Sequence, residues 1–242
     1  MEKKTEWFQH WFDTKYYHLL YEHRDDEEAQ FFMQNLIDFL DLKEGNQLLD
    51  LPCGKGRHSV FLNSKGFAVV GADLSKNSID FAKQFENETL QFRIHDMREP
   101  LLKKYDTIFN LFTSFGYFEE DGTNVSVLKN FKKALYENGK IVIDFLNIDK
   151  IKKNLIADET FEKNGLIFHI TKEIKDEILI KEIYFNADGA SHHFTEKVQC
   201  LTLEKMTKLA EIAKLKVLHT FGDYNLNVFD KTNSDRLILI LQ

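Results

Sequence analysis

Residues 48–59 read LLDLPCGKGRHS, an apolar run that stops at Asp50 and continues into two glycines, Gly54 and Gly56, on either side of Lys55. An apolar run that ends in a Gly-x-Gly turn and restarts as a helix is typical of a nucleotide-type site in an open α/β sheet. The stretch therefore predicts a buried strand, a tight ligand-binding turn and a helix, in that order.

The segments that follow continue the same alternation. Short apolar runs read as buried strands, and the amphipathic stretches between them read as helices. The expected strands lie at 47–51, 67–72, 90–94, 106–111 and 139–145, and the expected helices at 57–65, 75–86 and 124–136. Ser75 is placed to cap the second of these helices. This βαβ pattern predicts a parallel sheet with helices on both faces.

The pattern changes after Asn147. Between 159 and 199 the chain has strand-like runs with interleaved lysine and glutamate, and Asp188-Gly189 reads as a hairpin turn, which predicts an antiparallel β insertion. A helix capped by Thr202 and strands at 215–221 and 236–241 complete a Rossmann-like, seven-stranded, mostly parallel sheet. We expect one domain over 1–242, with an N-terminal helical lid (1–44), an α/β core (45–147 and 200–242) and the insertion (148–199).

Charge and composition restrict the class of protein. The net charge of −7 over 242 residues disfavours nucleic acid and anionic membrane surfaces as partners. The two cysteines, Cys53 and Cys200, are too few and too distant to form a disulfide framework, and no apolar run reaches the roughly 18 residues of a membrane span. We expect a cytoplasmic protein that does not enter the membrane.

Asp50 indicates which ligand the turn binds. A pyrophosphate at this turn would meet a carboxylate of the same charge in a partly desolvated crevice, which is unfavourable. A ligand that carries an ammonium group would instead be attracted. S-adenosylmethionine carries an ammonium and a positive sulfonium but no phosphate, and glycines at 54 and 56 would let the backbone approach it closely. The third glycine of the dinucleotide fingerprint is replaced by Ser59.

Two further acids end the next two expected strands. Asp73 follows the second strand, where a carboxylate can accept both ribose hydroxyls of an adenosine. Asp96 follows the third strand and is expected to accept the exocyclic amine of adenine, with Met97 against the ring. Three acidic strand ends along one edge of a sheet suit an adenosyl cation better than a dinucleotide.

Taken together, these motifs resemble those of class I S-adenosylmethionine-dependent methyltransferases. The resemblance covers roughly residues 47–144, and the motifs occur in the family's order and spacing at 49–58, 71–75, 95–98 and 105–112. This chain departs from the family's usual residues at 52–55, where Pro52, Cys53 and Lys55 stand in place of small residues or threonine. Because these positions act mostly through the backbone, Pro52 and Cys53 are still counted in the cofactor loop.

The resemblance implies a role for each motif residue. Asp50, Gly54 and Gly56 would surround the methionine portion of S-adenosylmethionine, and Asp73 the ribose. The adenine would lie against Leu74, Asp96 and Met97. The side that faces the substrate would be formed by Asn110, Leu111 and Phe112. Cys53 is a buried, inert thiol in this interpretation, because it lies in the cofactor loop.

The substrate side is marked by aromatic and basic residues. In the N-terminal segment these side chains can form a lid over the cofactor or can simply pack a helix on the sheet, and both interpretations stand. The candidate substrate-contacting residues are Tyr17, Tyr21, Arg24, Arg57, Phe115 and Tyr117. His23, His58 and Tyr117 are candidates for a general base, and no residue is assigned as catalytic. His192 and His193 lack the spacing of metal ligands, so no metal site is expected.

The sequence therefore predicts an S-adenosylmethionine-dependent methyltransferase that acts on nitrogen or oxygen of a small molecule, for example an amino sugar or another amine, and releases S-adenosylhomocysteine. The alternatives are an NAD-dependent oxidoreductase and a protein that binds S-adenosylmethionine without catalysis. The charged strands of the insertion are compatible with a homodimer formed through them.

Overall fold

The computed structural model describes residues 6–21 and 26–242. Its larger sheet has seven strands in the order β10-β11-β5-β4-β1-β2-β3. Strands β1 to β5 pair in parallel, whereas β11 is antiparallel to both of its neighbours. The strands are β1 (Gln47–Asp50), β2 (Ala68–Asp73), β3 (Leu90–Ile94), β4 (Tyr105–Asn110), β5 (Leu135–Leu146), β10 (Val217–Phe221) and β11 (Arg236–Leu241). The predicted mostly parallel, seven-stranded sheet is confirmed.

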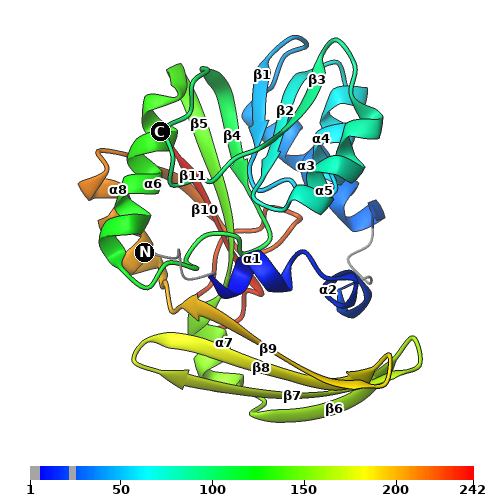
Figure 1. Ribbon diagram of the computed structural model, residues 1–242. Helices are drawn as coiled ribbons and strands as arrows, with labels where there is room; N and C mark the ends of the chain where they lie inside the picture. The colour runs from blue at the N-terminus through cyan, green and yellow to red at the C-terminus, as the bar shows by residue number, and fades with distance from the viewer. Residues whose placement is uncertain (1–5, 22–25) are drawn as a thin grey trace, which may run out of the picture.

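Helices cover both faces of this sheet (Figure 1). One face buries side chains of α3 (Asp26–Leu40), α4 (Arg57–Ser64) and α5 (Lys76–Ala82), which continues into a short 3-10 turn, η1 (Lys83–Phe85). The other face buries side chains of α6 (Asp121–Lys133) and α8 (Leu203–Ile212). The predicted caps are present, because the hydroxyls of Ser75 and Thr202 accept hydrogen bonds from backbone N–H groups in the first turns of α5 and α8.

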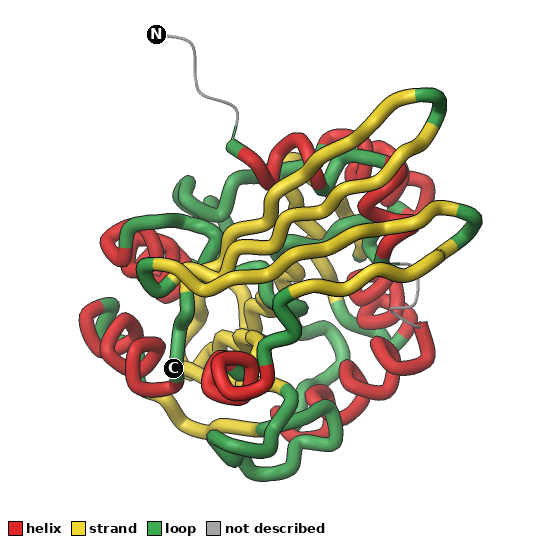
Figure 2. Tube along the Cα trace, turned by 90° about the horizontal axis from the view of Figure 1, so that it is seen from below, coloured by secondary structure: helices red, strands yellow, loops and turns green. Residues whose placement is uncertain are grey.

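The insertion forms a separate antiparallel sheet of four strands in sequence order. They are β6 (Asp158–Lys163), β7 (Leu166–Lys175), β8 (Ile178–Ala187) and β9 (Ala190–Gln199), and α7 (Ile148–Asn154) precedes them. Asp188 and Gly189 both have positive φ, at 52° and 75°, which fits the predicted two-residue turn between β8 and β9. Figure 1 shows this sheet beyond one end of the larger sheet, and Figure 2 shows its strands crossing the molecule from that side.

The helical spacing of apolar residues between 7 and 42 predicts two helices, separated by the charged residues 23–28. The described residues of this segment instead form three, because the first stretch breaks between α1 (Trp7–Trp11) and α2 (Lys15–Leu20). Thr14 begins α2 as its N-cap, because its hydroxyl accepts a hydrogen bond from the N–H of Tyr17 at 3.1 Å. Whereas α3 packs on the large sheet, Trp11 and Leu20 pack against the inner face of the insertion. The N-terminal segment therefore packs on both the large sheet and the insertion.

Candidate functional site

The loop after β1 is fastened to the carboxyl end of β2. The N–H of Cys53 donates to the carbonyl of Ala72 at 2.8 Å, and the N–H of Gly54 donates to the Asp73 carboxylate at 2.8 Å. The other Asp73 oxygen accepts from the N–H of Ser75 at 2.8 Å. Asp73 thus holds the loop that follows β1 and the turn into α5 in one fixed arrangement.

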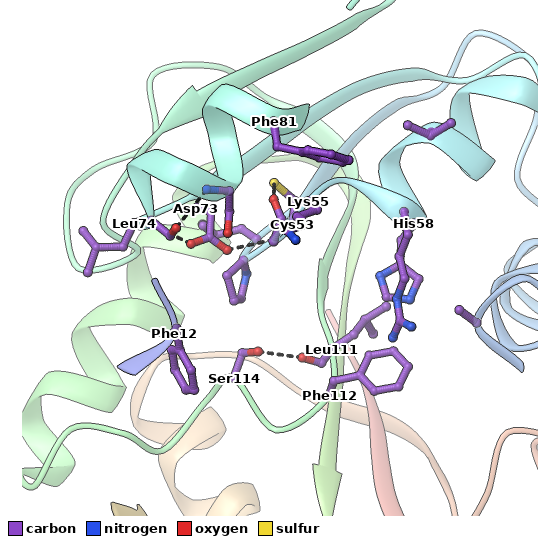
Figure 3. A pocket seen from close by; sticks show the side chains of 18 of the residues that line it. Phe12, Cys53, Lys55, His58, Asp73, Leu74, Phe81, Leu111, Phe112 and Ser114 are labelled. Atoms are coloured by element: carbon purple, nitrogen blue, oxygen red, sulfur yellow. Dashed lines mark hydrogen bonds between the residues drawn. The ribbon is translucent and has the colours of Figure 1, made fainter. Parts of the chain in front are cut away.

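A cavity of about 860 Å³ opens over this loop at the carboxyl ends of the parallel strands. Figure 3 shows Asp73 and Leu74 on one side, Phe81 above the loop, and Phe12 and Phe112 across the cavity from Phe81. A cavity of this size, with apolar walls and a few converging polar groups, is typical of a small-molecule site. Its position also follows the rule that open α/β sheets bind ligands at the carboxyl ends of their strands.

Most of the residues predicted to bind a cofactor line this cavity. They are Pro52, Cys53, Gly54, Asp73, Leu74, Asp96, Met97, Leu111 and Phe112. Asp50, Gly56 and Asn110 do not line it, since Asp50 and Asn110 are the buried last residues of β1 and β4, and Gly56 is the N-cap of α4. The Asn110 amide donates to the carbonyl of Leu51 at 2.8 Å and so supports the loop from below. The structure separates the predicted residues into a lining set and a supporting set.

Asp50 is the most unusual member of the supporting set. One of its oxygens accepts from the Ser59 hydroxyl at 2.7 Å, and the other has no hydrogen-bond partner among the described residues. Burial raises the pKa of Asp50 to about 7, against the opposing effect of the Ser59 hydrogen bond. Because burial destabilises its ionised form, this carboxyl would be stabilised as a carboxylate by a positive charge bound nearby.

The two loop glycines have different reasons to be glycine. Gly54 has φ +54°, and a Cβ built on it would meet no atom within 4 Å, so the space beside it belongs to the cavity. Gly56 has φ +88°, and a Cβ there would lie 2.7 Å from the Phe92 ring. The prediction that both glycines make room for the ligand thus fits the surroundings of Gly54, whereas Gly56 is required by internal packing.

Two other acids of the cavity, Asp73 and Asp96, are held in place by hydrogen bonds. Burial raises the pKa of Asp73, although hydrogen bonds from Ser75 and Gly54 oppose this shift. Burial also acts on Asp96, but hydrogen bonds from Arg98 outweigh it and lower the pKa of Asp96. Arg98 in turn bonds Glu6 at 2.7 Å, which joins the adenine side of the predicted site to the N-terminal segment. Burial raises the pKa of the Cys53 thiol, consistent with its interpretation as inert.

A second cavity, of about 940 Å³, lies between the large sheet, the insertion and α7. Five aromatic side chains line both cavities and form their common boundary. We call them the aromatic ring: Phe12, Tyr17, Tyr21, Phe112 and Tyr117. Phe112 and Thr113 are consecutive non-glycine residues with positive φ, at 58° and 62°. Such backbone strain is found where the surrounding structure enforces it, often at functional sites.

The predicted substrate residues are distributed around this boundary. Tyr17, Tyr21 and Tyr117 belong to the aromatic ring. Arg57 lies in the first cavity, with its guanidinium 4.8 Å from the centre of the Phe112 ring, and His58 stacks on the same ring at 5.1 Å.

Three other predicted residues lie elsewhere. Phe115 is fully buried in the core and lines neither cavity, because its side chain packs among residues of the sheet face that α6 covers. Its neighbour Tyr117 reaches the boundary instead. Arg24 and His23 lie outside the described residues.

Several residues of the two cavities were not predicted. Phe12, Phe81 and His95 line the first cavity, and Glu196 and Arg236 line the second. The sequence offered one weak signal, an arginine directly at the start of the last apolar strand. Among the described residues, no group of three or more His, Cys, Asp or Glu side chains is arranged to hold a metal ion. Within the same residues, no helix has the length and apolarity needed to cross a membrane.

Comparison with known proteins identifies the family. A family model described as a methyltransferase domain matches residues 42–213. The chain belongs to this methyltransferase family. A glycine/sarcosine N-methyltransferase of Halorhodospira halochloris is 31% identical over 216 residues, which cover 86% of this chain and 78% of that protein. A putative methyltransferase of Bacillus subtilis, YqeM, is 31% identical over 124 residues, half of each protein.

Solved methyltransferases share the fold of this one. An S-adenosylmethionine-dependent methyltransferase from Clostridium acetobutylicum superposes with a TM-score of 0.80 at 18% identity, over 94% of this chain and 95% of that one. CalS10 of Micromonospora echinaspora, an amino pentose methyltransferase solved with S-adenosylmethionine, gives 0.70 at 15% identity, over 94% and 96%. The predicted membership of the class I S-adenosylmethionine-dependent methyltransferases is confirmed, and the NAD-dependent alternative is set aside.

The first cavity fits S-adenosylmethionine. Its volume suits a ligand of this size, and Gly54 leaves open space where the methionine portion would approach the backbone. Asp73 holds a fixed carboxylate where the ribose hydroxyls would lie. The buried oxygen of Asp50, which has no hydrogen-bond partner among the described residues, would supply a negative counter-charge beneath the loop once an ammonium is bound.

Proposed function

We propose that this methyltransferase transfers the methyl group of S-adenosylmethionine to an amine nitrogen of a small molecule held in the second cavity. The observation that carries the proposal is the aromatic ring, where the second cavity adjoins the cofactor cavity. A methyl transfer needs the acceptor and the sulfonium methyl to meet in line, so two adjoining cavities with a common boundary suit this reaction.

The lining of the second cavity favours an amine as acceptor. Aromatic faces attract cations, and the five residues of the aromatic ring line this cavity. They favour an acceptor that arrives as an ammonium ion. The names of the relatives agree with this choice, because they include glycine/sarcosine N-methyltransferases and a sugar N-methyltransferase.

The chain's own residues chiefly bind and orient the reactants. When bound, S-adenosylmethionine supplies an electrophilic methyl on a sulfonium, whose neutral thioether product leaves without an acid. An acceptor that arrives as an ammonium must first lose one proton, because only the neutral amine has the lone pair that attacks the methyl. His58 and Tyr117, the predicted base candidates, line the first cavity and would take that proton directly or pass it to water. Tyr21 is fixed at the boundary, since its hydroxyl donates to Glu196 at 2.8 Å and accepts from Lys181 at 2.6 Å. Trp11 also donates to Glu196, at 2.6 Å. This network ties α1 and α2 to the insertion and so holds the residues of the aromatic ring in place between the two cavities.

The proposal is tested by turnover with paired acceptors. The purified protein is incubated with S-adenosylmethionine and either an amine or the alcohol of the same skeleton, for example an amino sugar and its parent sugar. Release of S-adenosylhomocysteine with the amine, together with a mass gain of one methylene on that amine, is the expected result. Turnover of the alcohols alone would contradict the proposal. Binding of S-adenosylmethionine without turnover across a broad set of amines would favour the non-catalytic alternative.

A further inference from the structure

One cation of the second cavity is held unlike the others. Arg236, the first residue of β11, donates through Nε to Asp144 at 2.7 Å and through Nη2 to Thr113 at 3.0 Å. No hydrogen bond from its Nη1 is found among the described residues, and its side chain is 20% exposed and lines the cavity. The guanidinium is therefore clamped in orientation on one side while part of its donor capacity remains on the cavity side.

The clamp also places Arg236 next to the aromatic ring. The Asp144 carboxylate accepts from the N–H of Phe112 at 2.9 Å, and the Asp144 carbonyl accepts from the N–H of Thr113 at 2.9 Å. The same two residues form the strained turn that presents Phe112 to both cavities. The Tyr224 ring packs over the guanidinium at 5.9 Å. A group bound by Arg236 would therefore sit beside the boundary where the methyl group is transferred.

The other charged groups of the cavity mostly have partners of their own. Lys150 pairs with Asp235, Lys172 with Glu159, and Glu196 takes hydrogen bonds from Trp11 and Tyr21 near Lys181. Asp223 accepts from backbone and side-chain N–H groups of its own turn. Glu28, which is exposed on α3, interacts with Arg236 through its charge, and no hydrogen bond between the two is found among the described residues.

We propose that Arg236 anchors an anionic group of the acceptor, so that the substrate of this site is an amine that also carries a carboxylate or a phosphate. A guanidinium held from one side binds such oxyanions with charge-assisted hydrogen bonds. The two sources differ in size: the carboxylate would belong to an amino acid, and the phosphate to a phosphorylated or nucleotide-linked amino sugar. This inference rests on the proposed function, since it assigns the acceptor of the same cavity.

The test compares each anionic amine with a neutral counterpart in two pairs. Glycine is compared with glycinamide, and an amino sugar 1-phosphate with the free amino sugar. The ratio of kcat/KM within each pair is measured for the wild type and for Arg236→Gln. Lys152→Gln serves as the matched control, because Lys152 is a cation of α7 that pairs with Glu177 and does not line the cavity.

The inference predicts that the wild type prefers the anionic member of one pair by roughly 10- to 100-fold, the loss expected from one or two charge-assisted hydrogen bonds. Arg236→Gln should bring that ratio close to one, and Lys152→Gln should leave it unchanged. The pair that responds identifies the source of the anion. A wild type without preference in either pair would overturn the inference while leaving amine methylation intact. An Arg236→Gln variant that slows both members equally would also overturn it, because a merely structural role predicts that result.

A binding measurement separates the inference from the proposed function. Protein saturated with S-adenosylhomocysteine is titrated with glycine and with the amino sugar 1-phosphate, and heat of binding is recorded for the wild type and Arg236→Gln. Binding to the wild type that is lost in the variant upholds the anchor even where no methyl group is transferred. The inference would be overturned if neither ligand bound to the wild type.

Discussion

The two cavities of this protein are built in different ways. Apart from residues of the N-terminal helices, the cofactor cavity is lined by one stretch of chain, from Leu51 to Phe118, which forms consecutive strand ends of a parallel sheet. The second cavity, proposed to hold the acceptor, is lined by five segments that are far apart in sequence: the N-terminal helices, the loop after β4, the insertion with α7, the loop after β10, and the start of β11. The first cavity therefore follows from local motifs, whereas the second follows from how distant elements pack.

Replacing Asp73 should give the largest effect on the cofactor side of this comparison. Asp73→Ala removes the carboxylate that is predicted to bind the ribose and releases the N–H groups of Gly54 and Ser75. We expect S-adenosylhomocysteine affinity to fall at least about 100-fold, the effect of losing two charge-assisted hydrogen bonds. Titration calorimetry measures this, with Asp80→Asn, an exposed acid of α5, as the control. Affinity within threefold of the wild type in Asp73→Ala would show that the strand end does not hold the ribose.

The pH dependence of the free energy of unfolding tests whether burial raises the pKa of Asp50. Because burial raises the pKa of Asp50 to about 7, the native state binds more protons than the unfolded state between pH 4 and 7. Asp50 therefore contributes stability at low pH that is lost as the pH rises through 7. Relative to Asp50→Asn, the wild-type free energy of unfolding should fall by about 2 kcal/mol from pH 5 to pH 7.

Urea unfolding of both proteins without cofactor measures this difference at each pH. Parallel pH profiles for the wild type and Asp50→Asn would mean that Asp50 has an ordinary pKa in the folded protein. The prediction concerns the difference between the two profiles, so titration of other groups cancels. A matching difference would strengthen the assignment of Asp50 as the counter-charge of the bound ammonium.

The two loop glycines sharpen the comparison at a smaller scale. Gly54→Ala adds a methyl group toward the cavity, so we expect cofactor affinity to fall about tenfold, with a stability cost of about 1 kcal/mol from the positive φ. Gly56→Ala places its methyl group against Phe92, so we expect a stability loss of about 1–3 kcal/mol. Calorimetry and urea unfolding of both variants separate the two effects. Equal losses of affinity in both would contradict the division into lining and supporting residues.

Much of the fold could be predicted because its determinants are local. The run into Asp50, the caps at Ser75 and Thr202 and the turn at Asp188-Gly189 are each specified by a few neighbouring residues. The break before α2 was missed because the aromatic periodicity continues across it, and the Thr14 cap outweighs that periodicity. Most of the residues predicted to bind the cofactor line one cavity for the same reason, since strand ends of a parallel sheet meet at one edge.

The acceptor side could not be predicted because its determinants are not local. Arg236 and Asp144 are 92 residues apart, and their pairing depends on the antiparallel register of β11 against β5. Phe115 was predicted to face the acceptor, but its neighbour Tyr117 lines both cavities while Phe115 lies in the core. Sequence spacing within a loop does not determine which of two aromatic residues turns outward. The predicted homodimer through the insertion stays a prediction.

The most direct test of the account is a crystal structure of the protein with S-adenosylhomocysteine. The account predicts adenosine beside Asp73, the amino acid portion over Gly54, and the thioether sulfur directed at the aromatic ring toward the second cavity. A complex in which the sulfur faces away from that ring, or in which the ligand occupies the second cavity, would contradict the claim that the two cavities meet where the methyl group is transferred.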